Sequence, residues 1–303
     1  MAAAPASQPD LATPELATLE LAVVGHVEWV SFLALEQLPA AGTISHATAF
    51  REEPAGAAAV AAVQLARLTG RPVRLYTALG SDAIGQQAAA RLIALGLDLQ
   101  VVWRDAPTRR AVSVVDAAGE RTITVIGERL APAACDPLPW AELARCDGVF
   151  VTATDAEALA LCRRARVLTA TPRLRLPVLE ASGVTCDALI GSALDPAEVV
   201  PDGALSRPPL LRIATEGAAG GWSVPGGRFA AVPLTVSPVD SYGCGDSFAA
   251  GVTAGLAAGW SLADTIALGA RCGADCAGVF GPYAAPQRPR RQRAGGDQQG
   301  LWE

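Results

Sequence analysis

The chain has 303 residues, of which 51 % are hydrophobic and 18 % are charged, and its formal net charge is −6. This composition is that of a globular protein with one large domain or two small ones, and the acidic balance disfavours nucleic-acid binding. All 24 basic residues are arginines, and the lack of lysine excludes a Walker A loop, a protein kinase with its strand lysine and a pyridoxal Schiff-base enzyme. Because the chain has two histidines, a three-histidine zinc site is excluded as well.

The cysteines and the chain ends favour a cytoplasmic location. The seven cysteines include no C-x-x-C pair, a pattern typical of reduced, mostly buried thiols. No stretch of about 18 residues is free of charged or strongly polar groups, so we expect no membrane span. Residues 1–20 lack a basic start, which argues against a signal peptide and favours a disordered leader. The arginines of residues 286–303 favour a flexible basic tail.

Between these ends, short β-branched runs alternate with alanine-rich helical stretches. In chain order the patterns predict a strand at 21–25, a helix at 57–68, a strand at 73–77, a helix at 82–95, strands at 148–152, 188–190 and 211–214, and helices at 247–257 and 262–277. This alternation predicts an α/β fold whose mainly parallel sheet is covered by helices on both faces.

Two segments interrupt this alternation. Residues 42–50 alternate in the manner of an exposed strand, and residues 111–115 and 121–125 indicate a hairpin whose turn contains Gly119. We expect these segments to form a small side sheet, separate from the main one. Beside the crevice of an α/β fold, such a sheet is a candidate lid.

The run DSYGCGDSF at residues 240–248 carries the most informative chemistry in the sequence. Gly243, Cys244 and Gly245 end a loop, and we expect a helix to begin near Asp246. Unpaired N–H groups in the first helical turn and the helix dipole make an anion pocket that needs no lysine. Asp246 at the mouth of this pocket either caps the helix or acts as a general base toward an attacking hydroxyl.

This run resembles the C-terminal signature of the ribokinase-like (PfkB) family of carbohydrate kinases, with serine in place of threonine and cysteine in place of alanine. Residues 78–98 are similar to the family's GxDxxG segment and the leucine and glycine positions that follow it. Residues 119–122 resemble its GeRt hairpin, and residues 215–220 resemble its TxGxxG nucleotide loop. The resemblance extends over residues 21–285.

The resemblance implies a three-layer α/β sandwich over residues 21–285, with a small β-sheet lid made of residues 27–55 and 105–126. It also implies an ATP-dependent kinase that phosphorylates a hydroxyl of a sugar or sugar-like molecule, with Mg²⁺ as cofactor. The residues that it assigns are Asp246 as catalytic base, Gly243, Cys244 and Gly245 as anion hole, Thr215, Gly217 and Gly220 at the ATP site, Asp240 in a loop that borders a monovalent cation such as K⁺, and Ser192 and Asp195 in place of an Asn-x-x-Glu motif.

Two of the nucleotide-side candidates have a structural alternative. Asp195 either reaches magnesium through water or merely opens the next helix. Cys272 is a further candidate on this side, and its alternative is packing in the core as a small hydrophobic residue.

The substrate half of the site departs from the family pattern. The family's substrate aspartate would fall at Val30, and the nearby acid is Glu28, which either recognises a hydroxyl or is surface charge. Where the family has two glycines and an asparagine, this chain keeps one glycine, Gly56, and no asparagine. His26 either contacts substrate or is a satisfied, partly buried histidine. Fewer hydrogen-bonding groups imply a different or less polar substrate.

Two alternatives stay open beside the carbohydrate kinase. One is a nucleoside kinase of the same superfamily, and the other is a non-catalytic relative that binds a ligand. The missing asparagine and Val30 favour the non-catalytic relative, whereas the intact Asp246 opposes it. We expect a small-molecule partner, no nucleic acid and no membrane, and the resemblance implies a homodimer formed through the lid sheet.

Overall fold

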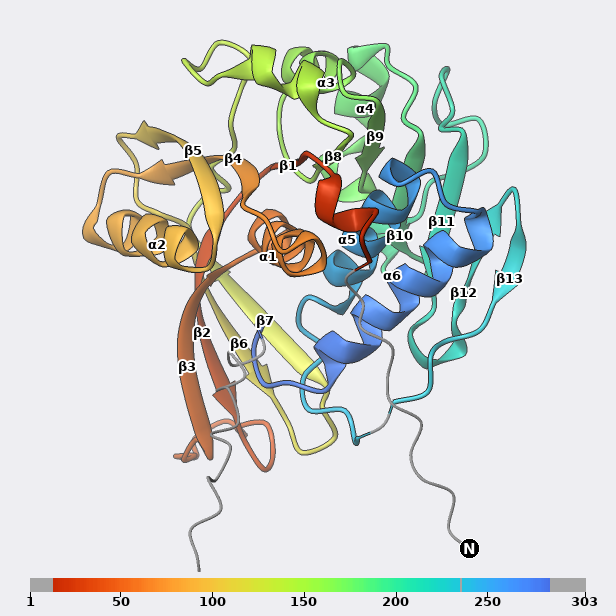
Figure 1. Ribbon diagram of the computed structural model, residues 1–303. Coiled ribbons are helices and arrows are strands. Elements are labelled where there is room, and N and C mark those ends of the chain that lie inside the picture. Colours follow the sequence, from red (N-terminus) through yellow and green to blue (C-terminus); the bar gives the residue numbers. More distant parts are fainter. Residues whose placement is uncertain (1–12, 235, 284–303) are drawn as a thin grey trace, which may run out of the picture.

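The computed structural model describes residues 13–234 and 236–283. A large sheet crosses the protein with helices on both faces, and a small sheet stands beside it (Figure 1). The expected tail, residues 286–303, lies outside the described residues, and so do residues 1–12 of the expected leader. Leu16 lies in a short 3-10 helix and is fully buried in the core, so the described end of the expected leader packs on the protein.

Nine strands form the central sheet in the described part of the chain. In spatial order they are β13 (Gly227–Phe229), β12 (Gly221–Val224), β11 (Leu211–Thr215), β10 (Ala188–Ser192), β9 (Val167–Ala170), β8 (Gly148–Val151), β1 (Leu21–Val24), β4 (Val73–Gly80) and β5 (Leu97–Arg104). The strands from β11 to β5 run parallel, and β12 and β13 form an antiparallel edge. The five predicted strands and the mainly parallel α/β architecture are confirmed. The sequence patterns did not predict four further strands, because these are short or mix buried with exposed residues: β5, β9, β12 and β13.

Helices cover both faces of this sheet. The α-helices of the described residues are α1 (Ala57–Thr69), α2 (Ala83–Ala94), α3 (Ala156–Cys162), α4 (Leu176–Ser182), α5 (Cys244–Ala257) and α6 (Leu262–Ala277). The 3-10 helices are η1 (Leu16–Thr18), η2 (Trp140–Arg145), η3 (Pro172–Leu174), η4 (Pro196–Glu198) and η5 (Gly217–Ala219). The four predicted helices are α1, α2, α5 and α6, and α5 begins at Cys244, before the expected Asp246. In the part of the chain that is described, no helix is both long and apolar enough to cross a membrane.

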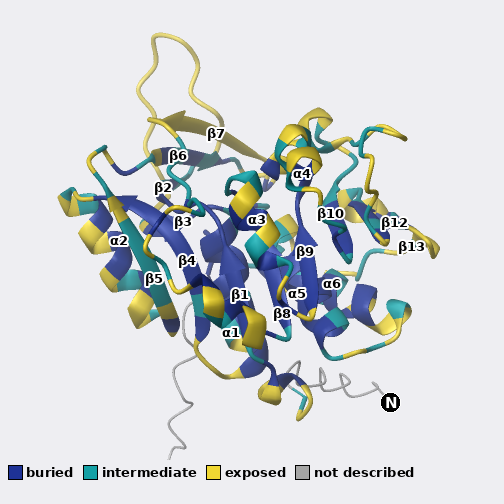
Figure 2. Ribbon diagram, turned by 90° about the horizontal axis from the view of Figure 1, so that it is seen from above, coloured by how far each residue is buried: buried dark blue, intermediate teal, exposed yellow. Residues whose placement is uncertain are grey.

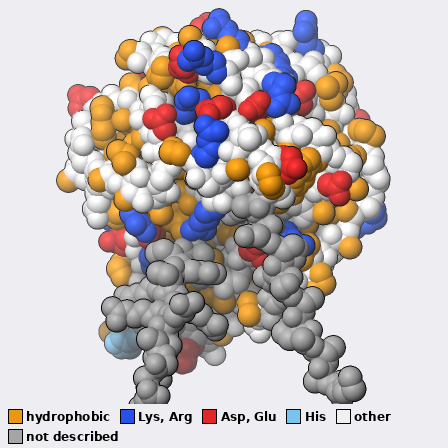
Figure 3. All heavy atoms as spheres, viewed as in Figure 1, with side chains coloured by type: hydrophobic (Ala, Val, Ile, Leu, Met, Phe, Trp, Pro, Cys, Tyr) orange, Lys and Arg blue, Asp and Glu red, His pale blue; other side chains and the backbone are white. Residues whose placement is uncertain are grey.

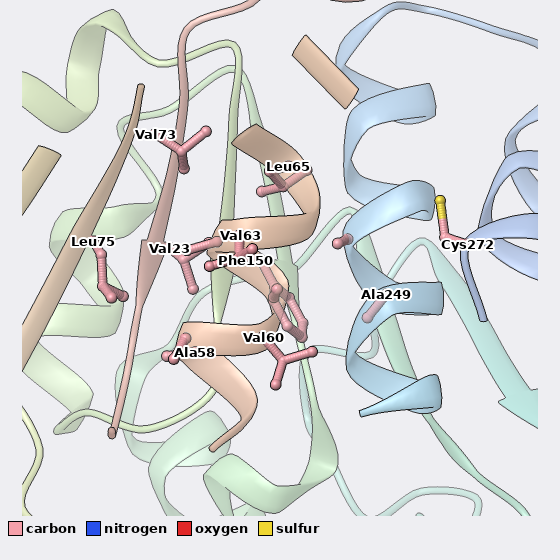
Figure 4. Close-up of a cluster of buried hydrophobic side chains, with 14 of the residues drawn as sticks. Val23, Ala58, Val60, Val63, Leu65, Val73, Leu75, Phe150, Ala249 and Cys272 are labelled. Carbon is pink, nitrogen blue, oxygen red and sulfur yellow. The ribbon is translucent and has the colours of Figure 1, made fainter. Parts of the chain in front are cut away.

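Alternate residues of the central strands face the two helical layers. On β1, Val23 packs in one cluster with residues of α1 and α5, whereas Ala22 and Val24 pack in another with residues of α3. On β4, Leu75 packs in the first cluster and Tyr76 in the second. Figure 4 shows the first cluster, in which aliphatic side chains of α1 fill the space between the sheet and α5. Burial on both faces explains why these strands are continuously hydrophobic in sequence.

The small sheet, called the lid sheet below, has its strands in the order β3 (Ala49–Ala55), β2 (Glu28–Ala34), β6 (Arg110–Val115) and β7 (Arg121–Ile126). β2 and β6 run parallel, and the two outer pairs are antiparallel. The predicted side sheet and its hairpin are therefore confirmed, with Gly119 at a φ of +80° in the turn. The strand expected at 42–50 begins only at Ala49. Figure 2 shows β7 exposed along its whole length, in contrast to the buried central strands.

The contacts that attach the lid sheet to the rest of the protein include two sets near α2 and the end of the described chain. At the start of α2, the carboxylate of Asp82 accepts hydrogen bonds from the hydroxyl (2.6 Å) and the N–H (2.9 Å) of Thr108, which precedes β6. On β3, Nη1 of Arg51 donates to the carbonyl of Tyr283 at 2.9 Å, and the hydroxyl of Tyr283 donates to the carbonyl of Pro54 at 2.7 Å. The segment after α6 therefore packs against the lid sheet.

Candidate active site

A glycine turn at the start of α5 faces open space. Gly243 has a φ of +78°, and a Cβ added there would lie 2.9 Å from Cγ1 of Val60 on α1, so glycine is required. At Gly245 an added Cβ would meet no atom within 4 Å. Gly243 has no side chain with which to cap the helix. The N–H of Cys244 donates to the carbonyl of Ser241 at 3.4 Å, whereas that of Gly245 has no such partner among the described residues and is available to an anion.

Asp246 lies in the first turn of α5 and is partly buried. Burial, and next the nearby charge of Glu198, raise the pKa of its carboxyl to about 7 against the opposing effects of Arg121 and Arg173. A carboxyl that titrates near neutral pH is suited to accept a proton in a catalytic step.

Arg121 connects the lid sheet to the loop that precedes α5. Its Nη1 donates hydrogen bonds to the carbonyl (2.5 Å) and the hydroxyl (3.0 Å) of Ser241. Its guanidinium lies 5.8 Å from the ring centroid of Tyr242. The hairpin that resembles the GeRt motif therefore brings a cation into the neighbourhood of Asp246.

One arginine holds the two carboxylates that follow β10. Asp195 caps η4 by accepting a backbone N–H at 2.9 Å, and its other oxygen pairs with Arg173. Glu198 accepts a hydrogen bond from the N–H of Ser192 at 2.8 Å and pairs with the same guanidinium. Asp195 therefore does open the short helix η4, and its role toward magnesium stays a prediction. Glu198, which the sequence analysis missed, is the acid whose charge acts most strongly on Asp246.

Asp195 and Glu198 are the residues that could help to hold magnesium. Carboxylate oxygens are the protein ligands that Mg²⁺ takes when nucleotide phosphates and water complete its shell. Each carboxylate has one oxygen paired with Arg173 and the other bonded to a backbone N–H, so this donor set fits an ion held through water rather than directly. Within residues 13–234 and 236–283, no group of three or more His, Cys, Asp or Glu side chains is arranged to hold a metal by itself.

Asp240 anchors the loop before α5. It is buried, and its two carboxylate oxygens accept the N–H groups of Tyr242 (2.9 Å) and Gly281 (3.0 Å). These bonds hold the loop against the segment that follows α6. The monovalent-cation site expected beside this loop stays a prediction.

The candidate nucleotide loop is a tight turn that follows Thr215, the last residue of β11. The N–H of Glu216 donates to the carbonyl of Gly220 at 2.7 Å. Gly220 has a φ of +88°, and an added Cβ would lie 2.1 Å from a backbone carbonyl oxygen, so glycine is required. Gly217 lies beside Leu194, which is 69 % exposed. An exposed leucine beside a glycine turn offers an apolar surface to a flat ring.

On the substrate side, Glu28 and Tyr242 meet at the corner between β1 and α1. Oε2 of Glu28 lies 2.9 Å from Nε of Arg109, and Oε1 accepts a hydrogen bond from the hydroxyl of Tyr242 at 3.4 Å. That hydroxyl in turn accepts the N–H of Gly56 at 3.0 Å. Glu28 is therefore buried and not surface charge, and burial raises its pKa despite the adjacent Arg109. Val30 packs in the hydrophobic core.

His26 lies beside this group. Its Nε2 is 3.3 Å from the position of a Cβ added to Gly56. Its ring is buried, and Nδ1 has no hydrogen-bond partner among the described residues. Burial, and then the charges of Arg129, Arg109 and Arg173, lower its pKa to about 3, so the imidazole is neutral. The alternative of a satisfied histidine therefore does not describe this ring.

Most of the expected site residues converge on one edge of the central sheet. The carboxyl ends of parallel strands share an edge. There β11 and β10 end in Thr215 and Ser192, and the segments after β9 and β1 supply Arg173 and His26. The residues that sequence reasoning missed are Arg109, Arg129, Arg173, Glu198 and Tyr242. The hairpin predicted at 111–125 could have indicated two of them, because Arg109 and Arg129 lie on either side of it in the sequence.

Cys272 is not part of this group. It is fully buried in the cluster between α1, α5 and α6, and its Sγ accepts a hydrogen bond from Nε2 of Gln64 at 3.4 Å. Packing in the core, the alternative stated for this cysteine, is what the structure shows.

Comparison with known proteins identifies the family. Among solved structures, the fold is similar to that of ribokinase from Cryptococcus neoformans var. grubii in complex with ADP, at 23 % identity and a TM-score of 0.66 over 88 % of this chain and 96 % of that one. It is also similar to a microbiome-derived acarbose kinase, at 20 % identity and a TM-score of 0.69 over 88 % of this chain and 95 % of that one. A nucleoside kinase from Methanocaldococcus jannaschii matches at 18 % identity and a TM-score of 0.62 over 87 % of this chain and 93 % of that one.

Identities this low establish the ribokinase-like fold and no more than the fold. A search of curated proteins finds no match. The sequence itself matches the family described as pfkB family carbohydrate kinase over residues 18–193 and 204–288. Because this match covers both sheets and the glycine turn of α5, the chain belongs to the pfkB family of carbohydrate kinases.

Proposed function

We propose that the protein is an ATP-dependent phosphotransferase that phosphorylates a hydroxyl of a sugar or sugar-like small molecule. The observation that carries this proposal is the carboxyl of Asp246, with a pKa of about 7, beside an open glycine turn at a helix start. A base that is partly ionised near neutral pH and a pocket for negative charge are the two groups that transfer to a hydroxyl requires.

In the proposed reaction, the acceptor oxygen attacks the terminal phosphorus of ATP. A new O–P bond forms while the bond to the bridging oxygen breaks, and ADP departs. Asp246 takes the hydroxyl proton, and the N–H groups of residues 243–245 stabilise charge on the transferring phosphoryl group. When bound, Mg²⁺ neutralises charge on the nucleotide phosphates, and Glu198 and Asp195 would hold it through water.

The two substrates occupy opposite sides of the glycine turn in this proposal. The nucleotide lies along residues 215–220, with the exposed Leu194 beside its base. The acceptor lies below the lid sheet, where the buried Glu28 and the free Nδ1 of His26 are able to bind polar groups. Closure of the lid sheet would exclude water, which otherwise competes as the phosphoryl acceptor.

ATP consumption with a panel of sugars and nucleosides tests the proposal. Asp246→Asn should keep the fold and lower kcat by about 10²-fold or more, because it removes the base. Asp202 provides a matched control, since its side chain is 98 % exposed and Asp202→Asn should keep the wild-type kcat. Wild-type turnover by Asp246→Asn would contradict the assignment.

The same panel separates the alternatives. A nucleoside kinase would prefer nucleosides to sugars in kcat/KM. A non-catalytic relative would bind a ligand in calorimetry without consuming ATP, and the raised pKa of Asp246 argues against it.

A further inference from the structure

We propose that the acceptor carries an anionic group, a phosphate ester or a carboxylate, and that Arg109 and Arg129 bind this group beneath the lid sheet. The inference rests on the proposed phosphotransferase function and names the substrate class of the same site. Its basis is a local excess of positive charge in a chain whose net charge is −6.

Several arginines elsewhere in the protein are matched by acids. Arg91 pairs with Glu53 at 2.7 Å, and Arg163 pairs with Asp187 at 2.6 Å. The face in Figure 3 shows the same mixing, with basic side chains among acidic ones. A partly buried guanidinium with an unpartnered N–H group is a feature that a ligand would explain.

Four arginines from two parts of the chain lie near one another at the substrate side: Arg109, Arg129, Arg173 and Arg175. Arg109 precedes β6 and Arg129 follows β7, so both lie at the open end of the hairpin, where a Cβ added to Gly127 would be 3.9 Å from Cα of Arg109. Nη1 of Arg129 donates to the carbonyl of Arg173 at 3.2 Å. This bond joins the lid sheet to the segment after β9.

The acids of the site neutralise only part of this charge. Arg109 pairs with Glu28, and Arg173 pairs with the two acids that follow β10. Among the described residues, no carboxylate pairs with Arg129 or Arg175, and Nε of Arg129 has no hydrogen-bond partner there. Burial, and next the charges of Arg109, Arg175 and Arg173, lower the pKa of Arg129. An anion at this place would relieve both the repulsion and the missing hydrogen bond.

The backbone of Arg175 supports the same assignment. Its φ is +79°, and in the described part of the chain no other residue except glycine has a positive φ. A side chain in this region is strained, and strained residues concentrate at ligand sites. The charge of Arg175 also acts on Arg129.

The position of this group favours the acceptor over the nucleotide. Along the carboxyl edge of the sheet, the nucleotide loop follows β11, the two acids follow β10, Arg173 and Arg175 follow β9, and His26 follows β1. Arg109 contacts Glu28 on the acceptor side. The acids after β10 therefore separate the nucleotide loop from Arg109 and Arg129.

Matched acceptors test the inference. A set of neutral sugars, their phosphate monoesters and the corresponding sugar acids is assayed with ATP, and we expect one anionic series to exceed its neutral counterparts in kcat/KM. Which series does so identifies the anionic group. Arg129→Gln should lower kcat/KM for that series by roughly 10- to 100-fold more than for the neutral counterparts, because a charge-assisted contact is lost only with the anion. Arg110→Gln is the control, since Arg110 adjoins Arg109 in sequence and is exposed.

Binding measurements separate failure of this inference from failure of the proposed function. Calorimetry is done with a non-hydrolysable ATP analogue present, so that free anions do not occupy the phosphoryl pocket. If no acceptor is phosphorylated but anionic sugars bind more tightly than neutral ones, and Arg129→Gln removes the difference, the anion site stands and the kinase proposal fails. If neutral sugars are preferred in turnover or binding, or if Arg129→Gln weakens both series equally, the inference is overturned.

Discussion

The raised pKa of Asp246 is caused by residues that are distant in sequence. Burial comes from the packing of α5 against the sheet, and the neighbouring negative charge comes from Glu198 after β10. Arg121 on β7 and Arg173 after β9 act in the opposite direction, so the carboxyl titrates near pH 7 and not far above it. A base with this pKa takes up and releases a proton at neutral pH.

The raised pKa of Asp246 predicts the pH dependence of the reaction. The base must be ionised to accept a proton, so kcat/KM should rise with pH and level off above about 7. The measurement is kcat/KM across the range from about pH 5 to about pH 9. The residual activity of Asp246→Asn should lack this rise, and a wild-type profile that falls through neutral pH would contradict the role.

Gly245 provides a steric test of the anion pocket. An added Cβ meets no atom within 4 Å, so Gly245→Val should keep the fold. Its methyl groups would project into the space assigned to the phosphoryl group, and displacement of that group should lower kcat/KM by roughly 10- to 100-fold. Ala90→Val, on the exposed side of α2, adds the same methyl groups and should leave kcat/KM unchanged. Unchanged turnover by Gly245→Val would place the transferring phosphoryl group elsewhere.

At the scale of the elements, α2 carries one of the attachments of the lid sheet. Asp82 caps this helix through the N–H of Gly85 at 2.8 Å and also binds Thr108, directly before β6. The segment that resembles the family's GxDxxG pattern thus has a structural role here. It fixes the base of the lid sheet relative to the central sheet.

Asp82→Ala should lower the free energy of unfolding by about 1–2 kcal/mol at neutral pH, because the cap and the bond to Thr108 are lost. Partial burial opposes ionisation of this carboxyl, but the hydrogen bonds from Thr108 and from backbone N–H groups prevail and lower its pKa below 3.8. Its contribution is therefore present above about pH 4 and is lost as the pH falls further. Denaturant unfolding at several pH values measures this free energy, with Asp202→Ala as the exposed control. If the loss of stability in Asp82→Ala were as large in acid as at neutral pH, the contribution would not come from the ionised carboxylate.

At the scale of the whole molecule, the lid sheet has an edge, β7, that the described residues leave uncovered. All residues of β7 are exposed, including the apolar Ile123, Val125 and Ile126. Exposed apolar residues on an edge strand favour pairing with another chain. We therefore expect a homodimer through the lid sheet.

Analytical ultracentrifugation tests this expectation. The wild-type protein should sediment as a dimer and Val125→Asp as a monomer, since a charge on this strand opposes edge pairing. Leu210→Asp places the same charge at another exposed apolar position and should stay dimeric. A monomeric wild-type protein, or a dimeric Val125→Asp, would exclude this interface.

Local patterns in the sequence determined the layered α/β fold and the glycine turn before α5. Strands buried on both faces read as continuous apolar runs, and the glycines at 243 and 245 mark a turn directly before a helix. These features depend on residues adjacent in the chain or on a periodicity, so they can be read without coordinates. The same patterns missed β2, whose buried residues lie on both faces, and the packing of Leu16 on the core.

Tertiary structure alone decided which charges surround the glycine turn. Glu198, Arg173 and Arg109 become neighbours because β10, β9 and the lid sheet meet at one edge, and no spacing in the sequence states the order of strands in a sheet. Packing also decided that Glu28 is buried and that Cys272 belongs to the core. The pKa of a carboxyl follows from burial and from charges within a few ångströms, and those distances exist only once the chain has folded.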